Sequence, residues 1–334
     1  MEQTKERHWR RWVVLALMIL GFFLAYFVGG IFVPVQPYIS VAPEKLVYEP
    51  LISNFLGLGP LYLTNTLTTL IVTLILIIVL AFFTNRSLKN SQRTNLVPRG
   101  VGNAMEAILE MIYNLTESSA GQKWVRAIFP WFATILLYVL FANLLRLIPG
   151  FETIGVLHHA EDYGVAGFHA EPIAGHWNWY TAEEGEWVLA GFFRGLSVDM
   201  NFTLALALIS VVMTQIIGMR AQGGAYWSKF FNTRRMFKVP FFGAMDFLVG
   251  LLEIISELSK ILSFTFRLFG NMFAGTVLVA IAVSLIGFIT IVPSMLMLFE
   301  LFVGLIQAFV FGMLTMVFMA QATQGHGEEH AEAH

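Results

Sequence analysis

The chain has 334 residues, of which 57% are hydrophobic and only 13% are charged, and its mean hydropathy is +0.70. These values exclude an ordinary soluble enzyme and predict an all-α, polytopic membrane protein. The net charge of −2 points to no charged partner, and the absence of cysteine excludes disulfides and thiolate metal sites.

Six apolar segments are long enough to cross a membrane as helices. They cover residues 12–33, 61–83, 127–148, 200–219, 241–292 and 294–319. The first follows the basic stretch KERHWRR, an opening that suits either a cleavable signal peptide or a retained helix. Its length of about 22 residues and the poor cleavage site in GGIFVP favour a retained helix. We therefore expect residues 1–60 to form an extra membrane helix and an outer segment, ahead of a main domain at 61–334.

The basic residues predict how the chain is oriented in the membrane. Four Lys or Arg residues lie in the N-terminal tail, six in 84–126 and five in 219–239, which makes 15 of the 20. The alternate loops carry Lys45 and Arg194, and the long loop 150–198 is acidic. This distribution predicts an even number of crossings, with both termini on the inner, cytoplasmic side of the membrane.

Between the second and third apolar segments, residues 102–119 have the pattern of an amphipathic helix. Apolar side chains recur there at helical spacing, opposite three glutamates; the apolar set is Ala104, Ile108, Met111, Ile112 and Leu115, and the acidic set is Glu106, Glu110 and Glu117. The segment is too polar to span the bilayer. We expect it to lie flat on the inner membrane surface or to pack under the other helices.

The segment 241–292 is too long for one upright crossing. About 50 helical residues extend roughly 75 Å, more than twice the ~30 Å hydrocarbon core. Either a break near Gly270 or Gly275 makes two spans, or one helix crosses at a steep tilt. The placement of most basic residues on the inner side of the membrane favours one long, tilted helix. A sharp turn at Pro293 and a second helix would follow, and the two helices would form an oblique hairpin.

The outer loop 150–198 contains four histidines among acids and aromatics: His158, His159, His169 and His176. A metal site built from His158, His159 and Glu161 is one interpretation, and proton buffering at a channel mouth is another. We favour a solvated loop that caps the outer face. The His/Glu-rich tail at 322–334 is expected to be a disordered cytoplasmic end.

Arg267 is the most informative residue of the chain. It lies within LSFTFRLFGNMFAG, where an ionised guanidinium costs about 2.5–3.5 kcal/mol on insertion scales and is normally retained for function. Its neighbours three and four residues away are not acidic; they are Ser263, Phe264, Gly270 and Asn271. The counter-charge must therefore come from another helix or another chain.

Arg267 belongs to a polar stripe along its helix. Glu253, Lys260 and Arg267 are seven residues apart, so they stay on one face, and Glu257 and Asn271 fall within the same arc. Such a stripe lines water or a protein partner. The alternative is a buried ion network that ties helices together, with Glu257 paired to Lys260.

The following helix carries a second pair of polar residues, Glu300 and Gln307, seven apart on one face. For Gln307 the alternative interpretation is a hydrogen bond between helices. Glu300 stands alone among Leu and Phe residues, and a carboxyl that is neutral or ionised at moderate cost suits proton transfer. Thr276 lies about 180° around the long helix from Arg267 and marks a second, milder polar face.

The sequence resembles subunit a of the F-type ATP synthases. The motif FRLFGNMFAG, the acidic and basic stripe before it and IQAFVFGMLTMVF after it carry the resemblance. It extends from about Leu61 to Met319, through VPRGVGNAMEAILE, FANLLRLIPG and LSVDMNFTLALAL. The Arg-Leu-Phe-Gly-Asn core is highly specific to that family.

The resemblance implies a role for each residue that matches the family's motifs. Arg267 matches the essential arginine that faces the ion-carrying carboxylate of the c-ring. The other matching positions are Asn271 and Gln307 near that arginine, Glu253, Lys260 and Ser263 in the cytoplasmic half-channel, and Thr276 with Glu300 in a pair that is an acid and a histidine in some members.

Two positions depart from the family's pattern. The acid of the pair is on the second helix here, so the resemblance implies that the periplasmic relay runs through Glu300 alone. Arg146 occupies a site where some members carry an acid, which puts a proton-entry role there in doubt.

The resemblance implies a stator channel in which two offset half-channels pass protons to and from the c-ring carboxylates. The C-terminal hairpin would pack against the c-ring, and the other partners would be peripheral stalk subunit b, the remaining synthase subunits and lipid. Nucleotide chemistry would lie on other subunits, and no metal, cofactor or nucleic acid is expected.

Two other classes of function compete with this interpretation. A stand-alone secondary transporter needs internal repeats and a midplane cavity, and no repeat is visible in the sequence. A purely structural membrane anchor for the peripheral stalk would leave Arg267 unexplained.

Overall fold

The computed structural model describes residues 40–324, apart from short gaps at 55–56, 58, 95–100, 147, 149–153, 160–166, 174–175, 186, 231–239 and 287–290. The helix expected at 12–33 and most of the tail at 322–334 lie outside these residues.

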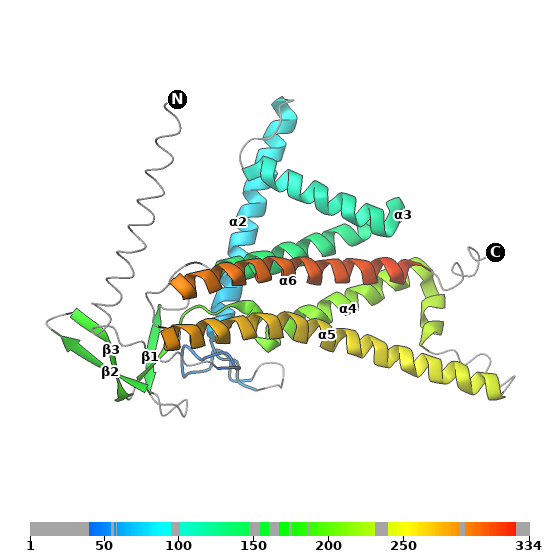
Figure 1. Ribbon diagram of the computed structural model, residues 1–334. Coiled ribbons are helices and arrows are strands. Elements are labelled where there is room, and N and C mark those ends of the chain that lie inside the picture. The colour runs from blue at the N-terminus through cyan, green and yellow to red at the C-terminus, as the bar shows by residue number, and fades with distance from the viewer. Residues whose placement is uncertain are drawn as a thin grey trace. The chain divides into compact units, whose positions relative to one another are not determined.

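The described part of the chain contains five helices that are long and apolar enough to cross a membrane. They are α2 (Asn65–Thr94), α3 (Val101–Leu145), α4 (Met200–Gln222), α5 (Pro240–Ile286) and α6 (Ile291–Thr323) (Figure 1). Their apolar runs form helices because each closes its backbone hydrogen bonds internally, as hydrocarbon requires. The helices agree with a polytopic membrane protein. The remaining expected crossing, at 12–33, falls outside the described residues.

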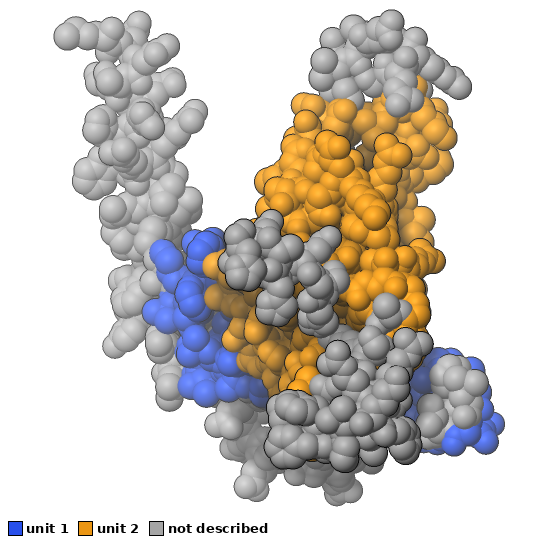
Figure 2. All heavy atoms as spheres, turned by 90° about the vertical axis from the view of Figure 1, so that its right-hand side faces the viewer, with its two compact units in different colours: residues 1–65, 149–194, 272–302 blue, residues 66–148, 195–271, 303–334 orange. Residues whose placement is uncertain are grey.

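The chain divides into two compact units, which Figure 2 colours separately. Unit 1 comprises residues 1–65, 149–194 and 272–302. Unit 2 comprises residues 66–148, 195–271 and 303–334. Helices α5 and α6 each contribute one part to each unit.

The core of unit 2 is built by α3, α4 and α6. Phe132 of α3 and Met316 of α6 are fully buried in it, and Ile217 of α4 packs beside them. Helices approach closely at Gly312, where an added Cβ would lie 2.9 Å from the Leu136 Cβ. Small residues allow this kind of close packing between membrane helices.

Helix α3 bends sharply at Gly121, which has φ 72° and ψ 166°. A positive φ with ψ near 180° is a region essentially restricted to glycine. The bend separates an arm at 101–120 from a longer arm at 122–145, and the first arm packs against the core of unit 2 through Ile112.

The buried face of this first arm differs partly from the predicted one. Ile108, Ile112 and Leu115 pack against the core as expected. Met111 is 61% exposed and Ala104 is also exposed, so these two residues do not belong to that face. Leu109 packs against the core as well, so the packed face contains Ile108, Leu109, Ile112 and Leu115.

Helix α5 runs without a break through Gly270 and Gly275, which confirms one long helix rather than two spans. The expected turn at Pro293 is wrong in detail. Helix α6 begins at Ile291, so Pro293 lies in its first turn. A proline is tolerated there because the first backbone N–H groups of a helix have no intrahelical partner.

Unit 1 contains strands that the sequence analysis did not predict in the outer loop. The strands are β1 (Gly155–His159), β2 (Gly167–Ile173), β3 (His176–Gly185) and β4 (Trp187–Gly191). They form one four-stranded antiparallel sheet in the order β1-β4-β2-β3. The loop does carry a signal for strands, because stretches such as HWNWYT are rich in aromatic and β-branched residues.

His158 of β1 is buried, and its Nδ1 lies 2.8 Å from the hydroxyl of Tyr48. The two rings meet edge to face with centroids 4.9 Å apart. This contact joins the sheet to the segment before α2 within unit 1. Glu161, the third residue of the metal interpretation, lies outside the described residues.

Candidate functional site

Arg267 projects from α5 at the surface of unit 2. Phe264 and Leu268, which lie about 60° and 100° around the helix from Arg267, are 2% and 1% exposed and anchor this part of α5 in the unit. Arg267 is exposed together with Ser263 and Asn271, which precede and follow it by four residues. These three side chains therefore form a polar row along one exposed face of α5, and Arg267 and Asn271 are its members from the predicted stripe.

The guanidinium of Arg267 has a hydroxyl as its neighbour rather than an acid. Its Nη2 donates to the Ser263 Oγ at 3.3 Å. No carboxylate pairs with Arg267 among the residues that the structure describes. The cation therefore remains available to a carboxylate of another chain, which is what a buried or lipid-facing guanidinium requires.

Glu257 and Lys260 form an ion pair one turn before this row. The Lys260 Nζ donates to the Glu257 Oε1 at 2.9 Å and lies 4.9 Å from the centre of the Phe318 ring. Glu257 is 9% exposed, and Glu253 is half-buried. The alternative interpretation of an ion network holding helices together thus describes Glu257 and Lys260 well.

In unit 1, Glu300 of α6 packs directly on Gly275 of α5. Glu300 is 9% exposed. A Cβ added to Gly275 would lie 2.6 Å from the Glu300 Oε1 and 3.2 Å from its Cδ. Glycine at 275 therefore makes the space that the carboxyl occupies, a role that the sequence analysis missed.

Thr276 is next to Gly275 and half-buried. Its hydroxyl donates to the backbone carbonyl of Met272 at 3.0 Å. A threonine that bonds its own helix in this way offers mainly its oxygen lone pairs to a neighbour.

Gln307 lies on α6 in unit 2 and is half-buried. One turn earlier, the carbonyl of Gly304 accepts a hydrogen bond from Asn143 Nδ2 at 3.0 Å. The Asn143 Oδ1 in turn accepts from Ser197 Oγ at 2.6 Å. Asn143 and Ser197 are 4% and 1% exposed, so this chain of polar groups is deeply buried in unit 2.

Sequence reasoning missed Asn143 and Ser197 as well. Both lie within stretches that carry the family resemblance, FANLLRLIPG and LSVDMNFTLALAL. Their meeting depends on how α3, α4 and α6 pack, which spacing within one helix does not reveal.

Arg146 follows directly after α3 and is 9% exposed. Its side chain packs on Gly195, where an added Cβ would lie 2.6 Å from the Arg146 Cδ. This position therefore has an anchoring contact in place of a titrating acid.

The residues described above recur at intervals of four along the two unbroken helices α5 and α6. On α5, Arg267, Asn271 and Gly275 succeed each other in steps of four residues, and on α6 Glu300 and Gly304 do the same. Steps of four keep residues on nearly the same helical face.

Comparison with known proteins identifies the family. The family model for the ATP synthase A chain matches residues 66–320. ATP synthase subunit a of Helicobacter pylori strain P12 is 32% identical over 255 residues, 75% of this chain and 89% of the relative. The subunit a of strain Shi470 is 30% identical over 278 residues, 82% of this chain and 97% of the relative. The subunit a of Campylobacter jejuni subsp. doylei is 30% identical over 256 residues, 75% of this chain and 87% of the relative. The chain therefore belongs to the ATP synthase A chain family, the proton-conducting stator subunits of the Fo membrane sector.

Proposed function

We propose that Arg267 faces the ion-carrying carboxylate of a c-ring and separates two offset half-channels. The observation that carries this proposal is the exposed guanidinium on an apolar helix, paired with no carboxylate in the described part of the chain. Such a charge is tolerated in a membrane when another chain supplies its counter-ion. The α5–α6 hairpin would then pack against the c-ring.

The outer half-channel would pass through Glu300. Its carboxyl rests on Gly275, and the next turn of α6 carries the Gly304 carbonyl bonded to Asn143. A buried carboxyl that changes between neutral and ionised forms passes a proton on, whereas Asn143 and Ser197 hold water or orient the path. Gln307 continues this polar row toward Arg267.

The inner half-channel would follow the stripe on α5 from Glu253 past Lys260 to Ser263. Lys260 donates a hydrogen bond to Glu257, and this ion pair would form part of the wall of the path. The exposed Ser263 hydroxyl, bonded to Arg267, would be the last group before the c-ring. Glu253 would be the group nearest the cytoplasm.

The mechanism follows from the cost of a bare charge in hydrocarbon. A c-ring carboxylate loses its proton only where Arg267 and water stabilise the anion, and it must be reprotonated before it enters lipid. Rotation is then the low-energy route between the half-channels, and the fixed charge of Arg267 repels a leaking cation. Each proton supplies about 2.3 kcal/mol per 100 mV of membrane potential, and several per turn drive ATP synthesis elsewhere in the complex.

The distribution of Lys and Arg supports a bacterial inner-membrane location with both termini in the cytoplasm. The arm of α3 at 101–120 would then lie at the inner surface, where subunit b of the peripheral stalk is a suitable partner. Residues 1–60 would add an extra membrane helix and an outer segment, and 61–334 would form the subunit a domain.

The first test replaces the cation. We expect Arg267→Ala to abolish ATP-driven proton pumping and proton-driven ATP synthesis while the complex still assembles, because Arg267 is exposed and its removal leaves the core of unit 2 intact. Pumping by the isolated complex in vesicles is the measurement, and its subunit composition is the control. Coupled transport near the wild-type rate would overturn the proposed role.

A further inference from the structure

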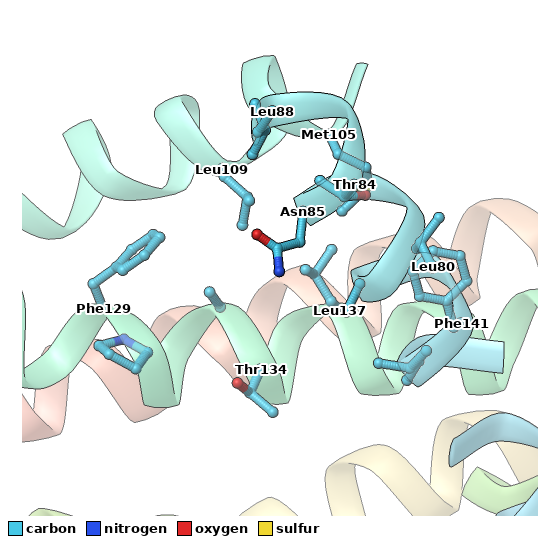
Figure 3. Close-up of a pocket in the computed structure, with 14 residues that line it drawn as sticks. Leu80, Thr84, Asn85, Leu88, Met105, Leu109, Phe129, Thr134, Leu137 and Phe141 are labelled. Carbon is cyan, nitrogen blue, oxygen red and sulfur yellow. The ribbon is translucent and has the colours of Figure 1, made fainter. Parts of the chain in front are cut away.

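A pocket lies wholly within unit 2, between α2 and the two arms of α3 (Figure 3). Its volume is about 390 Å³, within the range of ligand pockets of about 300–1,000 Å³. Its walls are mainly apolar, with Leu80 and Leu88 from α2, Leu109 from the first arm of α3, and Phe129 and Leu137 from the second arm. Nothing in the proposed proton path uses this pocket.

Two polar side chains of α2 line the same pocket. Figure 3 shows the amide of Asn85 pointing into the space between Leu109, Phe129 and Leu137. Thr84 is 6% exposed, and its Oγ1 has no hydrogen-bond partner in the part of the chain that the structure describes.

Thr84 differs in this respect from other threonines of the membrane helices. Those at 73, 116, 214, 265 and 315 each donate to the backbone carbonyl four residues earlier. A buried hydroxyl without a partner is costly, and in apolar surroundings its partner is most readily supplied by a ligand. The polar end of the pocket is therefore ready to receive an acceptor or donor from an otherwise apolar molecule.

Charges near the polar end indicate the class of that molecule. Arg86 and Lys89 follow on the exposed side of α2, at the end that the distribution of basic residues places at the inner membrane surface. Glu106 and Glu110 are exposed on the facing arm of α3. Basic residues at this depth attract lipid phosphate groups.

We propose that the pocket binds one acyl chain of an inner-leaflet phospholipid. The phosphate lies near Arg86 and Lys89, the ester region meets Thr84 and Asn85, and the chain fills the apolar space up to Phe141. A protein helix is a poorer occupant, because with a diameter of about 10 Å it would fit for only about one turn. The proposal depends on the inner-surface placement of the end of α2 and not on the proton path.

The test uses the whole ATP synthase complex reconstituted in phosphatidylethanolamine and phosphatidylglycerol vesicles. A trace of phosphatidylglycerol with a diazirine in one acyl chain is photolysed, and labelled peptides are identified by mass spectrometry. We expect labelling concentrated in residues 77–88 and 129–141. Ala81→Trp, which fills the pocket from an exposed position, should reduce this labelling at least five-fold.

The matched control is Ile78→Trp, on the same helix but outside the pocket and 65% exposed, which should leave the labelling unchanged. Thr84→Val, which removes only the hydroxyl at nearly constant shape, should reduce it about two-fold to five-fold and decides the question if Ala81→Trp fails to assemble. Equal labelling of the wild type and all three variants would show ordinary lipid contact and overturn the proposal. A photoreactive free fatty acid and the double variant Arg86→Gln with Lys89→Gln test the assignment to a phospholipid. If the fatty acid labels the pocket equally strongly and the double variant does not change this labelling, that assignment is overturned.

Discussion

At the scale of single residues, the position of Arg267 depends on the residues around it rather than on a partner within the chain. Phe264 is stacked against Phe318 with ring centroids 5.6 Å apart and lies near Phe311, so the turn that carries Arg267 is packed against α6. The guanidinium lies on an exposed face of that turn. Geometry as well as charge should matter for its role.

Because geometry should matter, we expect Arg267→Lys to lose coupled proton pumping. A lysine ammonium is a compact charge without the planar fork that matches a carboxylate, and it loses its proton readily when desolvated. We expect loss of coupled pumping in an assembled complex, measured as ATP-driven acidification of vesicles. Full coupling in the lysine variant would show that a positive charge alone is sufficient.

Gly275 allows a second test at this scale. A methyl group at 275 would lie 2.6 Å from the Glu300 Oε1, so the carboxyl must move away from its present position. Because that carboxyl ends a flexible side chain, we expect Gly275→Ala to assemble but to slow proton-driven ATP synthesis several-fold. Adding Glu300→Asp, which shortens the acid by one methylene, should restore part of the rate. A wild-type rate for Gly275→Ala alone would show that the position of the Glu300 carboxyl is unimportant.

At the scale of elements, some features could be predicted from sequence because they depend on one helix alone. The length of the apolar segment and the placement of basic residues predicted that α5 is continuous. The lack of an acid three or four residues from Arg267 predicted that no acid of its own helix pairs with it. The start of α6 was misplaced by the usual assumption that a proline marks the turn. The first turn of a helix accepts proline as well.

Other features were not predictable because they depend on contacts between elements. Asn143 and Ser197 are ordinary polar residues until the fold brings Asn143 to the carbonyl of Gly304 and Ser197 to the amide oxygen of Asn143. Gly275 matters only because Glu300 comes from another helix. The strands at 155–191 carry no clear alternation of apolar and polar residues, which is the pattern that identifies a half-buried strand.

The bend in α3 provides the prediction at this scale. Gly121 has φ 72° and ψ 166°, and an added Cβ there would meet nothing within 4 Å. Gly121→Ala should therefore act through backbone strain alone, costing on the order of 1–3 kcal/mol. We expect a lower thermal unfolding midpoint for the purified complex, whereas the control Gly224→Ala, which is equally open but not at positive φ, should leave it unchanged. Equal midpoints for both variants would show that the arm at 101–120 tolerates another bend.

At the scale of the whole molecule, each of the two units contains polar groups of the proposed proton path. Unit 2 carries the ion pair of Glu257 and Lys260, the Arg267 row and the bonded pair Asn143 and Ser197. Unit 1 carries Glu300 on Gly275. If the proposed role is right, the isolated chain should show no coupled transport in vesicles. A stand-alone transporter would instead work without other subunits.

The role of Glu300 is tested most directly by the output of the whole complex. Glu300→Gln preserves the size of the side chain and one carbonyl but cannot exchange a proton, and Gln fits the same space beside Gly275. We expect proton-driven ATP synthesis in vesicles, measured across a pH series, to slow strongly while the complex assembles normally. The double change Thr276→Glu with Glu300→His recreates the acid and histidine pair of other family members and should restore part of the rate. A glutamine variant with an unchanged rate and pH profile would show that water or another group carries the proton, and the relay would have to be assigned elsewhere.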